Sequence, residues 1–240
     1  MNTKQLIHDM HLDLQAAIDP VYKAGVTRYF KENIQVYGVR VPQVRKIAAK
    51  HALLFKKEPL SELWLLSEQL LKTGYMENAT IAIALVYKRK VEWRVQDFAT
   101  LERWVHTYVS NWAICDDLCN HCIGYCIATY PEVLPKVYAW TVSNNRWVRR
   151  AAAVSLIIPA RAGNNLVDVL NIATLLLHDA DDLVQKGCGW MLKEAAKKHQ
   201  QEIVSFIEKH KKTMPRTMLR YAIELMPADT KKRLMNKNML

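Results

Sequence analysis

The sequence predicts an all-α protein, a right-handed superhelical solenoid assembled from short helical repeats of the HEAT-like (ARM-like) kind. Apolar residues recur at helical spacing from end to end, and hardly any segment alternates with the period of two that marks a strand. Successive helix pairs recur roughly every 35 to 45 residues, which is the spacing of HEAT and armadillo arrays. Such arrays curve, so we expect a concave face, and the excess of basic residues predicts that this face is basic.

Proline and glycine mark the ends of the helices expected in the first half of the chain. The first helix carries Leu6 to Leu14 and stops before Pro20. The second carries Tyr22 to Ile34 and ends at Gly38. Prolines open the next two helices, because a missing N–H is tolerated in the first turn. The remaining helices of this half are expected at Pro42–Leu53, Pro59–Gly74, Met76–Tyr87 and Val95–Val109.

The second half continues with one long helix followed by shorter ones. The long helix runs from Trp112 to Tyr130, and Pro131 opens a short helix through Trp140. Later helices are expected at Arg146–Pro159, Leu166–Leu177, Leu183–Lys197, Ile203–His210 and Met218–Leu225, with a last one from near Ala228. No Pro/Gly/Ser-rich linker interrupts the series, so we expect a single domain over residues 1–240.

The charge of the chain favours a polyanionic partner. Its net charge is +11 and its pI is near 9.4, which makes nucleic acid the leading candidate, ahead of an acidic membrane surface or an acidic protein. Basic pairs near helix ends also have a commoner use, which is to balance the helix dipole. No apolar run approaches the roughly 20 residues that cross a bilayer. Because the N-terminus leads straight into an amphipathic pattern, we expect a cytoplasmic protein.

Four cysteines form a row inside the long helix. Cys115, Cys119 and Cys122 have a C-x3-C-x2-C spacing that holds iron–sulfur clusters in some enzymes, and Cys126 extends the row past His121. A cluster site needs a loop that brings three sulfurs to one point, whereas this segment reads as helix and places the cysteines along one stripe. Buried cysteine behaves as a small apolar residue. We therefore expect no metal, no cofactor and no disulfide here.

An aromatic residue, an anion and a cation mark a candidate site. Trp112 and Asp116 stand one helical turn apart on a single face, and a lone charge beside an indole is costly to bury. Arg149 and Arg150 lie in the first turns of a later helix. Each residue also has an ordinary explanation: a core tryptophan, a carboxylate that pairs with the helix dipole for about 0.5 kcal/mol, and a solvated arginine. Together they favour a site.

Trp190 stands beside two glycines within a predicted helix. Glycine inside a helix costs about 1 kcal/mol relative to alanine, so Gly187 and Gly189 indicate that something approaches the helix closely. When the motif is taken alone, tight helix packing is the favoured explanation. Tyr29 would likewise be an ordinary half-buried tyrosine. The set as a whole is harder to explain by packing.

At these residues the chain resembles the bacterial DNA alkylation repair family, the alkylpurine DNA glycosylases built from HEAT-like repeats (AlkD type). The resemblance covers nearly the whole chain, and the order and spacing of its motifs are more specific than any single one. The family often has two adjacent tryptophans where Asn111-Trp112 stand here. The motifs are Arg28-Tyr29-Phe30-Lys31, Tyr37-Gly38-Val39-Arg40-Val41-Pro42, Trp112-x-x-x-Asp116, Trp140-x-x-Ser143-x-Asn145-x-Trp147-x-x-Arg150 and Gln185-Lys186-x-x-Gly189-Trp190.

The resemblance implies a role for each matching residue. Trp112 and Trp190 would flank the cleft that holds the damaged nucleotide, and Asp116 would be the catalytic carboxylate. Asp117 follows it, so the assignment could slip by one position, although the spacing from Trp112 favours Asp116. Residues expected to bind DNA are Arg150 on the backbone beside the lesion, Tyr29 in the cleft, and Arg149, Trp147, Lys186 and Arg40.

The implied activity is that of a monofunctional glycosylase in base excision repair, which releases 3-methyladenine or 7-methylguanine from duplex DNA. The resemblance also implies that the lesion is contacted through its backbone while the base stays stacked. We further expect a monomer without an obligatory protein partner. Two alternatives stay open: a non-catalytic paralogue that binds branched or distorted DNA, with a steep salt dependence, and a protein-interaction scaffold whose charge serves solubility.

Overall fold

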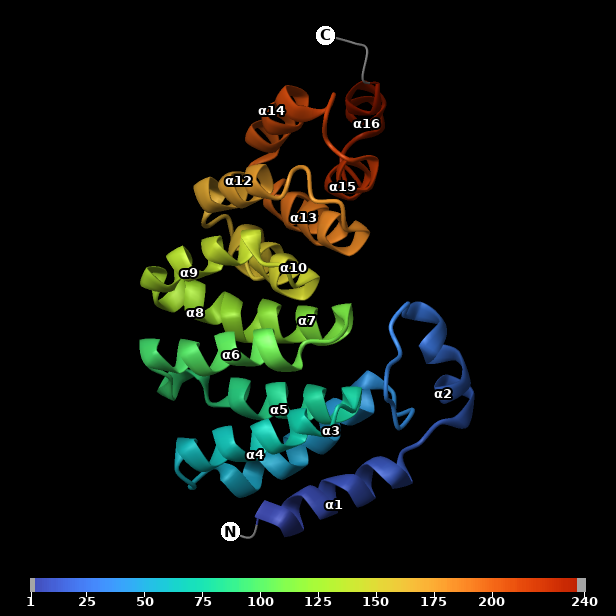
Figure 1. The fold of residues 1–240 in the computed structure, drawn as a ribbon, viewed down its shortest axis with the longest axis vertical. Helices are drawn as coiled ribbons and strands as arrows, with labels where there is room; N and C mark the ends of the chain where they lie inside the picture. The colour runs from blue at the N-terminus through green and yellow to red at the C-terminus, as the bar shows by residue number, and fades with distance from the viewer. Residues whose placement is uncertain (1–2, 237–240) are drawn as a thin grey trace. The chain divides into compact units, whose positions relative to one another are not determined.

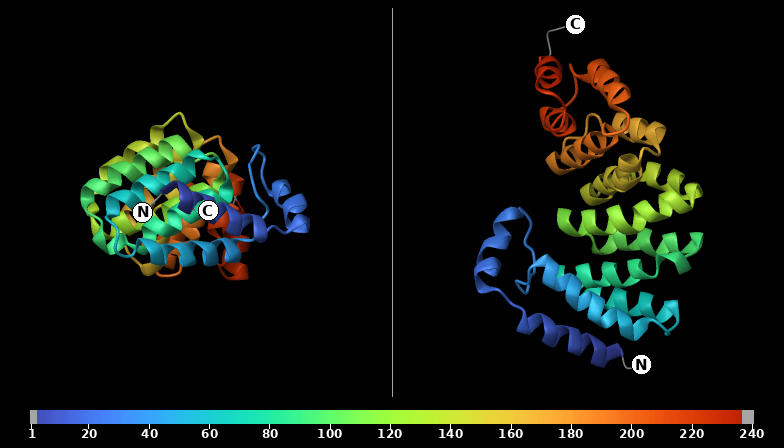
Figure 2. Two further views of the ribbon diagram at one scale, coloured as in Figure 1. Left: turned by 90° about the horizontal axis from the view of Figure 1, so that it is seen from below. Right: turned by 180° about the vertical axis from the view of Figure 1, so that it is seen from behind.

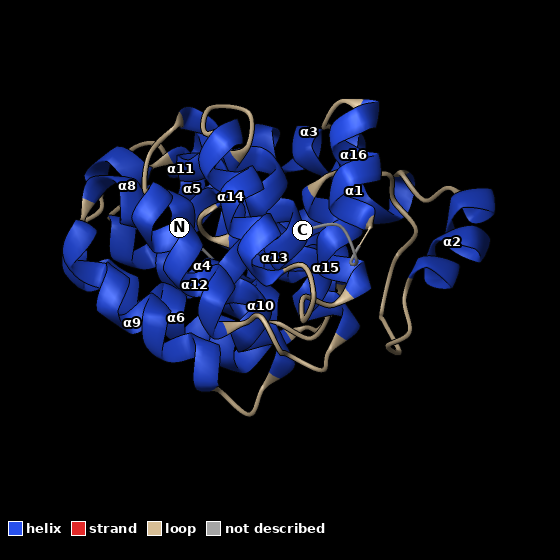
Figure 3. Ribbon diagram, turned by 90° about the horizontal axis from the view of Figure 1, so that it is seen from above, coloured by secondary structure: helices blue, strands red, loops and turns tan. Residues whose placement is uncertain are grey.

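The computed structural model describes residues 3–236, and helices account for most of them (Figure 1). No strand occurs in this described part of the chain; helices joined by short loops make up the structure (Figure 3), and one isolated bridge links Gln35 to Tyr75. The predicted all-α, helical-repeat class is confirmed. The helices are α1 (Thr3–Ala16), α2 (Pro20–Val26), α3 (Val41–Ala52), α4 (Leu60–Lys72), α5 (Met76–Lys88), α6 (Phe98–Tyr108), α7 (Trp112–Leu118), α8 (Gly124–Thr129), α9 (Leu134–Ala139), α10 (Arg146–Val154), α11 (Ile157–Ala162), α12 (Leu166–Leu175), α13 (Asp182–Ala195), α14 (Gln200–His210), α15 (Arg216–Ala222) and α16 (Ala228–Met235).

Contacts within the chain divide it into two compact units. Unit 1 comprises Met1–Asp97 and Thr107–Asp117, and unit 2 comprises Phe98–His106 and Leu118–Leu240. The divisions fall inside α6 and α7, not in a linker. A single domain, the right hand of the superhelix and its concave basic face remain predictions. None of the described helices is long and apolar enough to span a membrane.

The core of unit 1 lies where α3 and α4 pack on α5, with α1 covering α3 and α4. Leu63 and Leu66 of α4 and Ile81 and Leu85 of α5 are fully buried. Each such side chain contributes about 1.5 to 3 kcal/mol relative to its exposed state. Figures 1 and 2 show α2 beside this layer of helices and not within it. The segment that joins α2 to α3 therefore needs anchors of its own.

The predicted helix from Tyr22 to Gly38 is wrong over its second half. Helix α2 ends at Val26, a single 3-10 turn follows over Thr27–Tyr29, and residues 30–40 form a loop without helix. The buried carboxylate of Glu77 in α5 holds the far end of this loop. It accepts hydrogen bonds from the backbone N–H groups of Tyr37 (3.0 Å), Gly38 (2.8 Å) and Val39 (3.0 Å).

A loop can turn three successive N–H groups toward one carboxylate, whereas a helix directs them along its own axis. Gly38 has φ +97°, a left-handed conformation that glycine adopts without a steric penalty. We call residues 29–40, whose far end is held by Glu77, the strap. Its far end returns the chain to α3.

Two other predicted helices have irregularities. The helix from Trp112 is continuous to Thr129, but the residues Cys119–Ile123 form a π turn between α7 and α8. The helix predicted at Arg146–Pro159 is two helices, because α10 ends at Val154 and α11 begins at Ile157. Pro159 lies in the first turn of α11, where its missing N–H leaves no helical bond unmade.

In unit 2, α13 packs between α10 and α15, and its two glycines allow the close approach. A Cβ on Gly189 would lie 2.6 Å from the carbonyl oxygen of Met218 in α15. A Cβ on Gly187 would lie 3.2 Å from Val154 and 3.3 Å from the side chain of Arg150, both in α10. Tight packing therefore accounts for both glycines, and at Gly187 the packed group is one of the predicted site residues.

Candidate functional site

The structure places the predicted site residues in two groups, one in each unit. Unit 1 holds Tyr29, Arg40, Trp112 and Asp116, and unit 2 holds Trp147, Arg149, Arg150, Lys186 and Trp190. The two groups have different environments. In unit 1 Trp112 contacts the strap, and Asp116 lies on the same helix as Trp112, whereas the residues of unit 2 come from α10 and α13.

Trp112 is fixed by the beginning of the strap. Its indole stacks on Phe30 with the ring centroids 5.0 Å apart and the planes 11° from parallel. Its Nε1 donates a hydrogen bond to the backbone carbonyl of Tyr29 at 3.3 Å. The Tyr29 side chain itself is 76% exposed. Phe30 received no role from the sequence, although it follows Tyr29 in a quoted motif.

Asn111 starts the helix that carries Trp112 and Asp116. Its side-chain oxygen accepts a hydrogen bond from the N–H of Ile114 at 3.0 Å, so the position where the family often has a tryptophan holds a buried helix cap here. The cap fixes the beginning of α7. Asp116 follows one turn beyond Trp112 on the same helix, at a half-buried position.

The second of the two neighbouring acids on α7, Asp117, is directed toward α3. Asp117 lies 3.7 Å from a guanidinium nitrogen of Arg45 in α3. Consecutive residues on a helix point about 100° apart, so Asp116 cannot share the direction that takes Asp117 toward α3. This difference favours a structural role for Asp117 and leaves the face of Trp112 to Asp116.

Arg40 lies at the other end of the strap. Its Nε donates to a carboxylate oxygen of Asp19 at 2.8 Å, and its guanidinium lies 5.1 Å from the centre of the Tyr22 ring. The N–H of Tyr22, and then Arg40, hold the pKa of the Asp19 carboxyl below its usual value. Arg40 thus fastens the strap to α2, while most of its side chain stays exposed.

Arg150 is buried, so the alternative explanation that it is a solvated surface arginine is wrong. Its Nη1 donates to the backbone carbonyl of Leu183 in α13 and lies against Gly187. Burial of a guanidinium is tolerated only when its donors find acceptors. The contact with Gly187 shows why α13 has no side chain at that point.

The other basic residues near Arg150 have acidic partners. Arg149 forms a short ion pair with Asp179 (2.6 Å) and donates to the carbonyl of Ser143 (2.8 Å), and Asp179 raises the pKa of Arg149. Lys186 pairs with Asp182 one turn earlier at 2.7 Å. These contacts give both residues a structural role within unit 2.

Trp147 is nearly buried, one turn before Arg150 on α10. The guanidinium of Arg146 lies over its ring, 5.0 Å from the centre. Arg146 in turn pairs with Asp181, the residue that caps α13. The aromatic ring of Trp147 thus packs α10 in place and offers little surface to a ligand.

Trp190 is held through Glu194, one turn further along α13. The indole Nε1 donates to the carboxylate of Glu194 at 3.2 Å. That carboxylate also binds Arg161 (2.7 Å) and Lys197 (2.6 Å). Burial raises the pKa of Glu194, but the two cations and the indole outweigh burial and hold it below its usual value. Glu194 received no role from the sequence, although its spacing of four residues from Trp190 is a visible signal.

All five cysteines lie in the described part of the chain, where they are buried and form no disulfide. Burial raises the pKa of Cys188 to about 12, which keeps its thiol protonated and unreactive. The cysteines of the π turn pack as the apolar stripe that the sequence predicts. Within residues 3–236, no group of three or more histidine, cysteine or acidic side chains is arranged to hold a metal ion.

Comparison with known proteins identifies relatives of the chain. A family model described as DNA alkylation repair enzyme matches residues 10–226. The solved structure of a predicted DNA alkylation repair enzyme from Enterococcus faecalis is similar, with a TM-score of 0.78 and 16% sequence identity over 88% of this chain and 97% of that chain. No curated protein matches the chain. The structural likeness concerns the fold, and the family match covers most of the sequence.

Proposed function

The chain belongs to the DNA alkylation repair enzyme family, and we propose that it is a monofunctional DNA glycosylase. It hydrolyses the N-glycosidic bond of cationic alkylated purines in duplex DNA, with 3-methyladenine and 7-methylguanine as the expected substrates. Water adds to the sugar carbon, the bond to the purine breaks, and the free base leaves. The product is an abasic site for base excision repair. No cofactor takes part in this hydrolysis.

One observation carries the proposal: a firmly held indole stands one helical turn from a carboxylate on α7. Trp112 is stacked on Phe30 and hydrogen-bonded to the strap, so its ring is oriented before any ligand binds. Asp116 shares its helix face. A face that served only to pack helices would have no use for a carboxylate beside an oriented indole.

The chemistry of the substrate explains why these two side-chain types suffice. A purine alkylated at N3 or N7 carries a positive charge, so its glycosidic bond is weakened before the enzyme acts. Positive charge then develops on the sugar as the bond breaks. The Asp116 carboxylate stabilises that charge and orients the attacking water. An indole face attracts a cation by about 0.5 to 2 kcal/mol, and we assign this role to Trp112 and to Trp190.

The remaining predicted residues are assigned to DNA binding. Arg150 of α10 is proposed to contact a phosphate, and its side chain is held against α13 by Gly187 and the Leu183 carbonyl. Tyr29 and Arg40 offer exposed groups at the two ends of the strap. Arg149, Trp147 and Lys186 support the same region of unit 2, and contacts with phosphates would have to compete with their present partners.

Release of free base from duplex DNA treated with a methylating agent tests the proposal. The purified protein should release 7-methylguanine and 3-methyladenine, measured by chromatography, and leave abasic sites but no strand breaks. DNA binding without release would instead identify a non-catalytic DNA-binding paralogue. If neither binding nor release occurred, the protein would be an interaction scaffold, and the proposed function would be wrong.

A further inference from the structure

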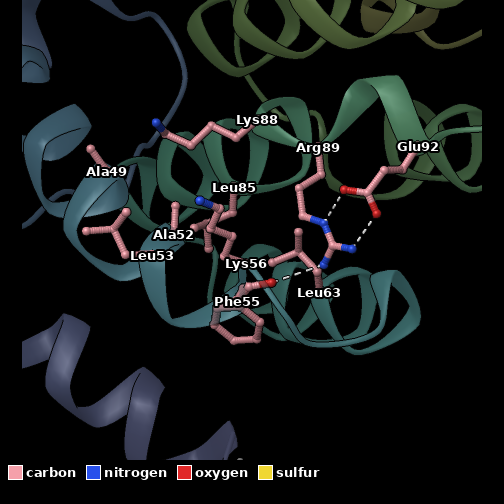
Figure 4. A pocket seen from close by; sticks show the side chains of 10 residues that line it. All are labelled: Ala49, Ala52, Leu53, Phe55, Lys56, Leu63, Leu85, Lys88, Arg89 and Glu92. Atoms are coloured by element: carbon pink, nitrogen blue, oxygen red, sulfur yellow. Dashed lines mark hydrogen bonds and ion pairs between the residues drawn. The ribbon is translucent and has the colours of Figure 1, made fainter.

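A cavity of about 350 Å³ lies in unit 1, and none of its lining residues belongs to the predicted site (Figure 4). It opens where the C-terminal ends of α3 and α5 come together over α4. Its volume falls within the range of about 300 to 1,000 Å³ that is usual for ligand pockets. The lining residues are Ala49, Ala52, Leu53, Phe55, Lys56, Leu63, Leu85, Lys88, Arg89 and Glu92.

The wall of the cavity on the Arg89 side is rigid. The Arg89 guanidinium donates to both carboxylate oxygens of Glu92, to the carbonyl of Phe55 (3.1 Å) and to the carbonyl of Glu58 (2.6 Å). Figure 4 shows the dashed contacts to Glu92 and to the Phe55 carbonyl. The ion pair keeps the pKa of Arg89 raised. Its donors are therefore committed to the protein, and this side of the cavity is preformed.

The exposed edge of the cavity has a different character. Lys56 and Lys88 are exposed, and neither forms an ion pair or a side-chain hydrogen bond with another described residue. Leu53 is 74% exposed beside them. Figure 4 shows both ammonium groups reaching past the aliphatic lining. An apolar hollow with two uncommitted cations is thus accessible to solvent.

Neither ordinary use of these residues explains the combination. Lysines at helix C-termini balance the helix dipole, but that use requires neither a hollow nor an exposed leucine. Duplex DNA supplies phosphates for lysines but presents no aliphatic group that would fill the cavity. The complementary ligand has an apolar side chain and neighbouring anions. Acidic peptides combine the two.

We propose that this cavity is a docking site for an acidic peptide segment of a partner protein. A leucine or phenylalanine side chain of the segment occupies the hollow between Leu53 and Leu85. Carboxylates on either side of that residue pair with Lys56 and Lys88. This site is independent of the proposed glycosylase activity, because none of its residues is assigned to DNA or to the reaction.

Fluorescence anisotropy with a labelled peptide, Asp-Asp-Glu-Leu-Phe-Asp-Glu, tests the proposal on the full-length protein. The double variant Lys56→Glu/Lys88→Glu should weaken binding by at least about tenfold, because it replaces attraction with repulsion. Leu53→Asn should weaken it by a smaller factor without any change of charge. All three positions are exposed, so folding is expected to be retained, and circular dichroism checks this.

Two controls separate docking from general attraction to a basic protein. The double variant Lys198→Glu/Lys209→Glu makes the same change of net charge at two exposed positions of unit 2, and it should leave binding nearly unchanged. A peptide with Ser-Ser in place of Leu-Phe should bind at least about tenfold more weakly, since it lacks the apolar anchor. Base release by Lys56→Glu/Lys88→Glu should equal that of the unchanged protein.

Three results would overturn the docking site. One is absence of peptide binding. Another is an equal loss of peptide affinity in the control variant that carries Lys209→Glu and in Lys56→Glu/Lys88→Glu, which would indicate attraction by net charge alone. The third is weakened binding of undamaged duplex DNA by Lys56→Glu/Lys88→Glu without any effect on the peptide, which would assign both lysines to nucleic acid. The glycosylase assay is unaffected by any of these outcomes.

Discussion

Trp112 is oriented by residues that lie more than eighty positions earlier in the chain. The stack with Phe30 and the hydrogen bond to the Tyr29 carbonyl remove the freedom of its two side-chain torsions. An indole that is already oriented loses little entropy when a ligand binds against it. At the scale of single residues, Phe30 is therefore a positioning residue for the proposed site.

Replacement of Phe30 tests this positioning role. Phe30→Ala should lower the single-turnover rate of base release by up to about tenfold, because an aromatic pair contributes about 0.5 to 1.5 kcal/mol beyond its buried area. Phe30→Tyr keeps the stack and should restore most of the rate. If both variants were as active as the unchanged protein, the orientation of Trp112 would have no part in the reaction.

Glu194 gives a second residue-scale prediction, with a defined dependence on pH. Its pKa is lowered in the folded protein, so the charged form contributes stability above the ordinary value of about 4.3 and loses it as the pH falls further. Glu194→Gln should reduce the free energy of unfolding by about 1 to 2 kcal/mol at pH 7. Urea denaturation should show a smaller difference at pH 3.5, and an equal difference at both pH values would contradict this account.

At the scale of elements, three backbone N–H groups of the strap share one acceptor, the buried Glu77 of α5. Glu77→Ala removes the acceptor of three backbone N–H groups, and we expect a loss of about 3 kcal/mol of stability. Hydrogen exchange of the Gly38 and Val39 amides should accelerate. The control Glu62→Ala removes an exposed acid from α4 and should change neither the stability nor the exchange rates. If these amides were as protected in the Glu77 variant as in the unchanged protein, other contacts would hold the strap.

The sequence predicted most helices but not the strap, for a physical reason. Periodicity reports the local pattern of burial, and residues such as Leu63 and Ile81 repeat at helical spacing because one face of their helix is buried. The residues of the strap also include apolar side chains at helical spacing. Their conformation is decided by Glu77, forty positions away, and a local pattern contains no information about that carboxylate.

The sequence likewise predicted only part of the candidate site. Trp112 and Asp116 could be paired from their spacing alone, because both lie on one helix. Phe30 and Glu194 were missed because their roles depend on contacts in the folded protein. Phe30 stacks on Trp112, and Glu194 accepts a hydrogen bond from Trp190. The burial of Arg150 was also missed, since only the packing of α10 on Gly187 reveals it.

At the scale of the whole molecule, the net charge of +11 predicts how binding should depend on salt. Each phosphate that the protein neutralises releases condensed counterions, and the logarithm of the binding constant falls by about 0.9 per contact for each unit of log salt. Filter binding of duplex DNA between 50 and 200 mM salt, a range of about fourfold, should show a steep linear decline. A binding constant that did not change with salt would contradict a basic DNA-binding surface.

Single-turnover release of 7-methylguanine by Asp116→Asn and Asp117→Asn is the most direct test of the central claim. We predict that Asp116→Asn abolishes release while its affinity for duplex DNA is retained, because the carboxylate acts on charge that develops during the reaction. Asp117→Asn should keep most of the activity, since its partner is Arg45. Unchanged release by Asp116→Asn, or loss of activity only in Asp117→Asn, would remove Asp116 from the mechanism.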